Sequence, residues 1–126
     1  MKKLLFFPLL LITCICFAQD AKKIIGKPIK IGNFLVAQND FPEQINWEDA
    51  KKACRSLGKG WRLPTRAELN ILYNNRKKIG GFILDNYYWS STELDDESAF
   101  NQDFTDGNQS DGYKRYKEYV RAIKSI

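Results

Sequence analysis

The chain has 126 residues, a formal net charge of +5 and no histidine. The lack of histidine excludes Ser-His-Asp and Cys-His catalysis and the usual zinc sites. The length fits one folded domain after processing, and no basic helix or stripe marks a nucleic-acid surface, so we expect no nucleic-acid partner.

The first 18 residues have the three-part pattern of a secretory signal peptide. Lys2 and Lys3 give a positive start, an apolar run covers 4–17, and Ala18 ends a cleavage site of small residues. The apolar run of about 14 residues is shorter than the about 20 needed to span a membrane. We therefore expect a signal peptide over 1–18, no stable membrane insertion after cleavage, and a secreted or periplasmic protein. The alternative is a lipoprotein anchored at Cys14.

Cleavage after Ala18 would leave 108 of the 126 residues, and Cys54 would be the single remaining cysteine. The formal net charge would fall from +5 to +3, because Lys2 and Lys3 leave with the signal peptide. No internal disulfide is then expected. We predict a flexible N-terminal arm over 19–28 and one domain over 29–126.

The first half of this domain has the pattern of a strand or hairpin followed by two helices. Residues 29–31 and 33–37 predict strands on either side of Gly32. Asn46 is the expected N-cap of a helix over 47–57 that Gly58 terminates. The apolar face of that helix consists of Trp47, Ala50, Cys54 and Leu57.

A second helix is predicted over 66–75. Pro64 holds Leu63 extended, and Thr65 with Glu68 forms a Thr-x-x-Glu capping box. The inner face of the second helix would consist of Leu69, Leu72 and Tyr73.

From residue 82 onward the pattern is β. Strands are predicted over 87–92, 99–105 and 119–123, the second with Phe100 and Phe104 alternating with polar residues. The segment 113–118 also fits a helical spacing and is left open. Turns are expected at Asp106-Gly107 and Asp111-Gly112.

Between Lys78 and Lys114 the chain has no basic residue and several acidic ones. One interpretation is a solvated loop surface, and the other is a site for calcium or a cationic ligand, because calcium prefers oxygen-rich loops. EF-hand spacing is absent, so calcium is only a weak alternative to a domain without cofactors. The calcium candidates are Asp103, Asp106 and Asp111.

Several segments between about residues 44 and 126 form a recognisable combination. These segments are Ala53-Cys54, the ten residues from Gly60 to Leu69, Tyr88-Trp89-Ser90-Ser91-Thr92, Phe104 with Gly107, and Val120-Arg121-Ala122-Ile123. Together they resemble the domain of unknown function at the C-terminal end of Legionella collagen-like adhesins. The resemblance implies an α+β, C-type-lectin-like fold, with two helices packed on a twisted, mostly antiparallel sheet, and members that bind sulfated polysaccharides.

Within that family, many members carry a second cysteine where this chain has Ala122. The family's bridge to Cys54 would then be missing, which leaves Cys54 as a free core thiol. Trp61 and Trp89 are expected in the core. Arg62 and Arg121 are expected to pair with carboxylates such as Glu68 or Glu118.

We therefore predict an exported, non-catalytic module that binds a glycan or a protein through the loops of 93–113. The alternatives are a structural component of the cell envelope and, as an enzyme, a hydrolase that uses two carboxylates among Asp95, Asp96, Glu97 and Asp103. A sulfated polysaccharide would instead need the basic strip Lys114, Arg115, Lys117, Arg121 and Lys124. The predicted ligand-binding residues are Tyr88, Asp95, Asp96, Asn101, Asp103, Asp106, Asn108, Asp111 and Tyr113.

Overall fold

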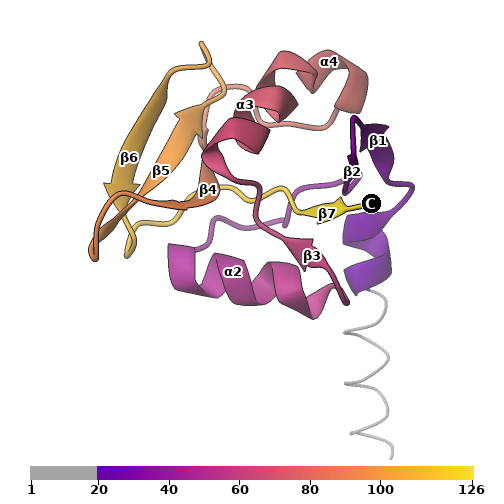
Figure 1. The fold of residues 1–126 in the computed structure, drawn as a ribbon, viewed down its shortest axis with the longest axis horizontal. Helices are drawn as coiled ribbons and strands as arrows, with labels where there is room; N and C mark the ends of the chain where they lie inside the picture. Colours follow the sequence, from indigo (N-terminus) through magenta and orange to yellow (C-terminus); the bar gives the residue numbers. More distant parts are fainter. Residues whose placement is uncertain (1–19) are drawn as a thin grey trace, which may run out of the picture.

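The computed structural model describes residues 20–126, which form two antiparallel sheets and the helices that pack on them (Figure 1). The four-stranded sheet has the order β1-β2-β7-β3, and the three-stranded sheet has the order β4-β5-β6. The predicted signal peptide and Cys14 lie outside the described residues. Within the described part, no helix has the length and apolar character needed to cross a membrane.

The four-stranded sheet joins the two ends of the domain. The predicted N-terminal hairpin is confirmed as β1 (Ile29–Ile31) and β2 (Phe34–Val36), with Gly32 in the turn at a φ of +58°. β7 (Ile123–Ser125) pairs with β2 on one side and with β3 (Trp61–Arg62) on the other. The prediction of a last strand over 119–123 was wrong in its bounds, because Tyr119 makes only an isolated bridge, to Tyr88.

Residues 20–25 form a short helix rather than the loose arm predicted over 19–28. Ala21, Ile24 and Ile25 pack against the core beside α2. The prediction followed the polar residues of this stretch and overlooked the helical spacing of Ala21, Ile24 and Ile25, which form an apolar face.

The helix α2 (Trp47–Ser56) confirms the first helical prediction. Asn46 caps it, since its side-chain oxygen accepts from the Asp49 N–H at 3.0 Å. Gly58 follows the last turn with a φ of +135°, a conformation that favours glycine. Trp47, Ala50 and Cys54 are buried along one face, as the periodicity indicated.

The second helix is also confirmed, as α3 (Arg66–Asn74) with a complete capping box. A further short helix, α4 (Arg76–Ile79), follows at once and was not predicted from the sequence. Its one buried residue, Ile79, provides too little periodicity to identify a helix.

The three-stranded sheet consists of β4 (Tyr87–Glu93), β5 (Ser98–Asp103) and β6 (Gln109–Tyr113). Asp106-Gly107 lies in the β5–β6 turn as predicted, but Asp111-Gly112 lies within β6, so the second predicted turn was wrong. The predicted alternation in β5 was also wrong. Asn101 is 3% exposed, whereas Phe100 is only half-buried beneath the Arg66 guanidinium.

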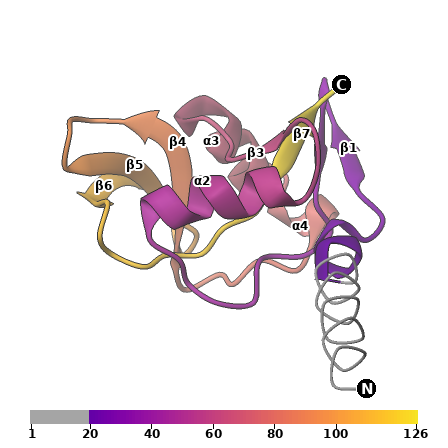
Figure 2. The same ribbon diagram turned by 90° about the horizontal axis from the view of Figure 1, so that it is seen from below.

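Two apolar clusters form the core. One lies along α2, which runs beside both sheets in Figure 2, and contains Trp47, Trp61 and Trp89. The other contains Leu69 and Leu72 of α3 together with residues of both sheets. Trp61 and Trp89 are 6% and 0% exposed, which confirms their predicted place in the core.

Cys54 is a buried free thiol in the same cluster as Ala122. Burial raises the pKa of the thiol to about 12. Because the thiolate is the reactive species, Cys54 should label with a maleimide or a disulfide reagent only after unfolding. The measurement is the labelling rate with and without denaturant, and fast labelling of the native domain would contradict the assignment of this helix face.

A buried ion pair joins the loop after β2 to the segment before β7. The Arg121 Nε donates to Asp40 Oδ1 at 2.7 Å, with the two side chains 0% and 10% exposed. Tyr88 donates its hydroxyl to the other Asp40 oxygen. The predicted pairing of Arg121 with Glu118 was therefore wrong, because Asp40 lies far away in the sequence and no local pattern indicates it.

Candidate functional site

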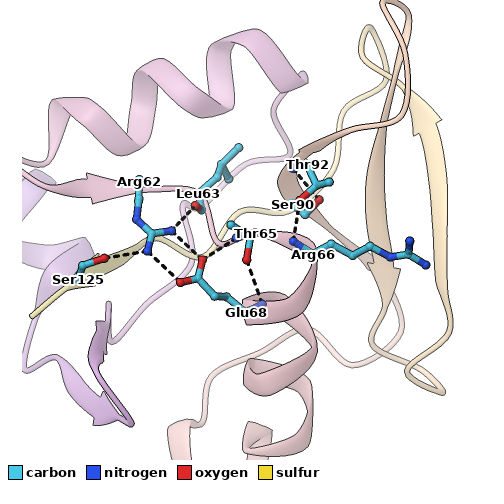
Figure 3. A network of polar contacts seen from close by, with 8 residues as sticks. All are labelled: Arg62, Leu63, Thr65, Arg66, Glu68, Ser90, Thr92 and Ser125. Carbon is cyan, nitrogen blue, oxygen red and sulfur yellow. Dashed lines mark hydrogen bonds and ion pairs between the residues drawn. The ribbon is translucent and has the colours of Figure 1, made fainter.

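The most specific sequence motif, Trp-Arg-Leu-Pro-Thr, forms a structural network (Figure 3). Arg62 donates to both oxygens of Glu68, at 2.7 and 2.9 Å, which confirms this predicted pair. A second contact joins Arg62 to Ser125 Oγ at 2.8 Å. The motif therefore connects β3, α3 and β7, and the Arg62 and Glu68 side chains stabilise the fold through these contacts.

The Glu68 carboxylate also completes the capping box. It accepts from the Thr65 N–H at 2.8 Å, and Thr65 Oγ1 accepts from the Glu68 N–H at 3.2 Å. Hydrogen bonds from Arg62 hold the pKa of Glu68 at about 2, well below its ordinary value. The ionised Glu68 carboxylate thus binds Arg62 and stabilises the N-terminus of α3.

The predicted binding residues separate into two ends of the three-stranded sheet. Asp95 and Asp96 lie in the β4–β5 turn, whereas Asp103, Asp106 and Asn108 lie at the β5–β6 turn. At the second end, Asp103 Oδ1 accepts from the Thr105 N–H at 2.8 Å and Asp106 Oδ1 accepts from the Asn108 N–H at 2.9 Å. These side chains stabilise the turn to which they belong.

Two predicted residues are buried and do not reach a ligand surface. Tyr88 is 0% exposed, and its hydroxyl accepts from the Ile83 N–H while donating to Asp40. Asn101 of β5 is buried, and its side-chain amide lies next to Gly112 of the neighbouring strand β6. Both were assigned to a binding surface because polar and aromatic residues in late β segments suggested exposed loops, and the structure corrects this.

A hollow of about 410 Å³ lies at the β4–β5 end of the sheet. It brings together three of the predicted residues, Asp95, Asp111 and Tyr113. The rest of its wall consists of Leu94, Glu97, Ser98, Gly112 and Tyr116. Tyr116 lies outside the predicted loops of 93–113, and the others lie within them but were not named as ligand-binding residues. The apolar Leu94 within an acidic turn was a usable indication.

The hollow combines exposed aromatic rings with carboxylates. Tyr113 and Tyr116 are 42% and 50% exposed, and their ring centroids lie 5.4 Å apart at an interplanar angle of 83°. The guanidinium of Arg115 lies 4.5 Å from the centre of the Tyr113 ring. Asp95, Glu97 and Asp111 supply hydrogen-bond acceptors around this pair of rings.

A buried acid lies beneath the wall of the hollow. Glu118 Oε1 accepts from Asn101 Nδ2 at 2.8 Å, and a Cβ atom placed on Gly112 would lie 3.6 Å from the same Glu118 oxygen. Burial raises the pKa of Glu118 to about 7.

The calcium candidates do not form a cluster. Asp103 and Asp106 are engaged in the β5–β6 turn, and Asp111 lies along β6 at the hollow. In residues 20–126 no group of three or more acidic or cysteine side chains is arranged to hold a metal ion.

The predicted basic strip is also divided. Arg121 is buried in the pair with Asp40, and Lys114 Nζ is bound to Glu93 Oε2 at 2.7 Å. Arg115 and Lys117 remain exposed, while Lys124 lies on β7 in the other sheet. These five residues therefore do not form one continuous cationic surface for a sulfated chain.

A second hollow, of about 370 Å³, lies between the helix of residues 20–25 and the end of α2. Its wall is more apolar and includes Ile24, Phe41 and Leu57.

Comparison with solved structures shows which fold this is. Convulxin, a snake venom toxin, shares 10% identity with a TM-score of 0.63, over 80% of this chain and 96% of that one. Botrocetin shares 10% identity with a TM-score of 0.60, over 80% and 98% of the two chains. EMS16, an antagonist of the collagen receptor integrin alpha2beta1, shares 13% identity with a TM-score of 0.59, over 79% and 97%.

Similarity at this level of identity establishes the fold alone, and the fold is C-type-lectin-like, as the sequence resemblance implied. No curated protein sequence matches the chain significantly. The profile of the Lcl C-terminal domain matches residues 21–124, which is most of the chain. The protein therefore belongs to the Lcl C-terminal domain family and has its α+β, C-type-lectin-like architecture.

Proposed function

We propose that this domain is an exported, non-catalytic binding module that holds a glycan in the hollow beside Tyr113 and Tyr116. The observation that carries the proposal is the pair of exposed tyrosine rings in a hollow lined with carboxylates. Membership of a family known from adhesins supports a location outside the cytoplasm.

The chemistry of the hollow suits sugar rings. The apolar face of a pyranose packs on an aromatic ring, and its hydroxyl groups donate to carboxylate oxygens. Tyr113, Tyr116 and Leu94 supply the apolar surface, and Asp95, Glu97 and Asp111 supply the acceptors. A neutral glycan fits this wall better than a sulfated one, because the carboxylates repel sulfate groups.

The alternative of a carboxylate hydrolase has less support. Asp95 Oδ1 accepts from the N–H groups of Glu97 and Ser98, at 2.9 and 2.8 Å, so this carboxylate stabilises the β4–β5 turn. Asp103 caps its own turn at the opposite end of the sheet. Asp103 is therefore too far away to act with a carboxylate of the β4–β5 turn, because catalytic carboxylate pairs lie within about 10 Å of each other. Asp96 and Glu97 lie in the same turn as Asp95, and all three are exposed to solvent.

A protein ligand is the second candidate for the same hollow. Botrocetin, which has the same fold, is also solved in complex with a mutant A1 domain of the von Willebrand factor. Exposed tyrosines next to an arginine are also typical of protein interfaces.

The test is a glycan array probed with the processed domain, with and without calcium, followed by affinities for the captured glycans. Tyr113→Ala and Tyr116→Ala should each weaken binding about tenfold or more, as interface anchors do. Each should change the free energy of unfolding by no more than about 0.5 kcal/mol, because both side chains are exposed.

Tyr87→Ala is the matched control, since Tyr87 is 41% exposed and lies at the opposite end of β4. It should leave the affinity unchanged. Equal losses in Tyr87→Ala and Tyr113→Ala would place the ligand elsewhere, and capture of sulfated glycans alone would favour the exposed basic residues Arg115 and Lys117. An array with no bound glycan would favour a protein ligand.

A further inference from the structure

Glu118 and Asn101 form an isolated polar pair inside the apolar core. They are 8% and 3% exposed, and one hydrogen bond joins them, from Asn101 Nδ2 to Glu118 Oε1 at 2.8 Å. The two residues come from different parts of the chain, since Asn101 lies in β5 and Glu118 bridges to Ile45 ahead of α2.

One oxygen of each side chain is buried without a hydrogen-bond partner. These two atoms are Asn101 Oδ1 and Glu118 Oε2, and both can only accept while the carboxylate is ionised. Two buried acceptors without hydrogen bonds destabilise the folded domain, because each has lost its water without gaining a partner. Exchanging the amide oxygen and nitrogen of Asn101 gives no relief, because an ionised carboxylate has no proton to donate to the amide oxygen.

A proton on Glu118 Oε2 would turn that atom into a donor, and Asn101 Oδ1, on the side chain already bonded to Oε1, is the buried acceptor that lacks one. In the pair proposed below, Oε2 donates to Asn101 Oδ1 while Oε1 accepts from Asn101 Nδ2. This is the two-hydrogen-bond arrangement of a carboxylic acid with a primary amide. Burial acts in the same direction, since it penalises the ionised form and raises the pKa of Glu118 to about 7.

The charged side chains on neighbouring elements leave Glu118 without a counter-ion. On β4 and in the loop after β6, Glu93 and Lys114 pair with each other at 2.7 Å. On α2, Lys51 pairs with Glu48, and on β6, Asp111 is exposed. Among the described residues, no cation is paired with Glu118 to offset an ionised carboxylate.

We propose that Glu118 keeps its proton in the folded domain and forms a closed acid–amide pair with Asn101 that supports the wall of the hollow. Gly112 connects the two features, because it lines the hollow and a Cβ atom placed on it would lie 3.1 Å from Asn101 Nδ2. The part of the proposal that concerns the hollow rests on the proposed function. The protonated pair itself does not.

A protonated Glu118 fixes the sign of a pH dependence. A carboxyl group with a folded-state pKa of about 7 and an ordinary value of 4.5 binds its proton more tightly in the folded domain. Its contribution to stability is complete below pH 4.5 and is lost as the pH rises through about 7. The domain should therefore be less stable in alkaline than in mildly acidic solution, and the hollow should lose affinity over the same range.

The direct test is a carbon-13 NMR titration of the Glu118 side-chain carboxyl in the processed domain. The expected midpoint is near pH 7 rather than near 4.5.

Glu118→Gln supplies a second test, because a glutamine amide makes the same two hydrogen bonds with Asn101 and carries no charge. Its denaturation midpoint should match that of the parent at about pH 5 and should exceed it at about pH 9.

Glu97→Gln is the matched control, since it removes the same charge from the exposed side of the hollow. It should leave the fall in stability between pH 5 and pH 9 unchanged.

A Glu118 titration midpoint near pH 4.5 would overturn the proposal, and so would a Glu118→Gln variant that is much less stable than the parent at pH 5. If Glu118→Gln fails to fold, the titration of the parent decides. The NMR titration and the denaturation measurements need no ligand. If the domain binds no glycan, the proposed support of the hollow is contradicted, but the proposed protonation of Glu118 is not.

Discussion

Trp89→Ala is expected to lower the free energy of unfolding by about 3–5 kcal/mol, the usual cost of removing a large aromatic from a core. Trp89 is 0% exposed and lies in the cluster that joins α2 to β4. Its indole N–H donates to the Ile45 carbonyl at 2.9 Å, so the substitution leaves a cavity and also removes one of the two hydrogen bonds that this carbonyl accepts, the other coming from the Glu118 N–H at 3.0 Å. Denaturant unfolding followed by circular dichroism measures the change.

Trp89→Phe separates the two contributions. Phenylalanine keeps most of the apolar volume and loses the hydrogen bond, so it should cost clearly less than alanine. A Trp89→Ala protein with the stability of the parent would contradict the placement of Trp89 between the helix and the sheet.

Asp40→Ala should also cost about 3–5 kcal/mol, because it leaves the Arg121 charge buried without its partner. The Arg121 side chain is 0% exposed, and its remaining hydrogen bonds go to the Ala37 and Gly80 carbonyls, both at 3.2 Å. The substitution also removes the acceptor of the Tyr88 hydroxyl. Thermal and denaturant unfolding of the parent and the variant measure the loss.

Glu48→Ala is the matched control, because it breaks the exposed pair between Glu48 and Lys51, whose atoms lie 3.1 Å apart. Surface pairs contribute about 0–1 kcal/mol, so this variant should remain close to the parent. Similar losses in the two variants would show that Arg121 finds solvent or another partner when Asp40 is removed.

The helices were predictable because their determinants are local. The Asn46 cap, the Thr65 and Glu68 capping box and the apolar face of α2 each depend on residues within one or two turns. The hairpin around Gly32 was predictable for the same reason. The fold class came from the family resemblance of several segments, one of which is the motif that contains the Arg62–Glu68 pair, six residues apart.

The errors arose where the decisive contacts are distant in sequence. Asn101 is polar, but its side-chain N–H donates to Glu118 on a separate segment inside the core, so its alternation with Phe100 misled the assignment of faces in β5. Arg121 finds Asp40, 81 residues away. The sequence predicted only part of the hollow, because the hollow depends on strand pairing. The pairing of β5 with β6 brings Gly112 and Tyr113 opposite Ala99 and Ser98, and no local pattern indicates this register.

The central position of β7 has a consequence for the timing of folding. Strand pairing joins Phe34 to Ser125 and Trp61 to Lys124, so the middle of the four-stranded sheet stays empty until residues near the end of the domain are available. Contacts of such high sequence separation slow folding, because a long loop must close before any pairing energy is gained. During synthesis of the chain, the four-stranded sheet therefore cannot close until residues 123–125 have been made, whereas the three-stranded sheet of consecutive strands does not depend on them.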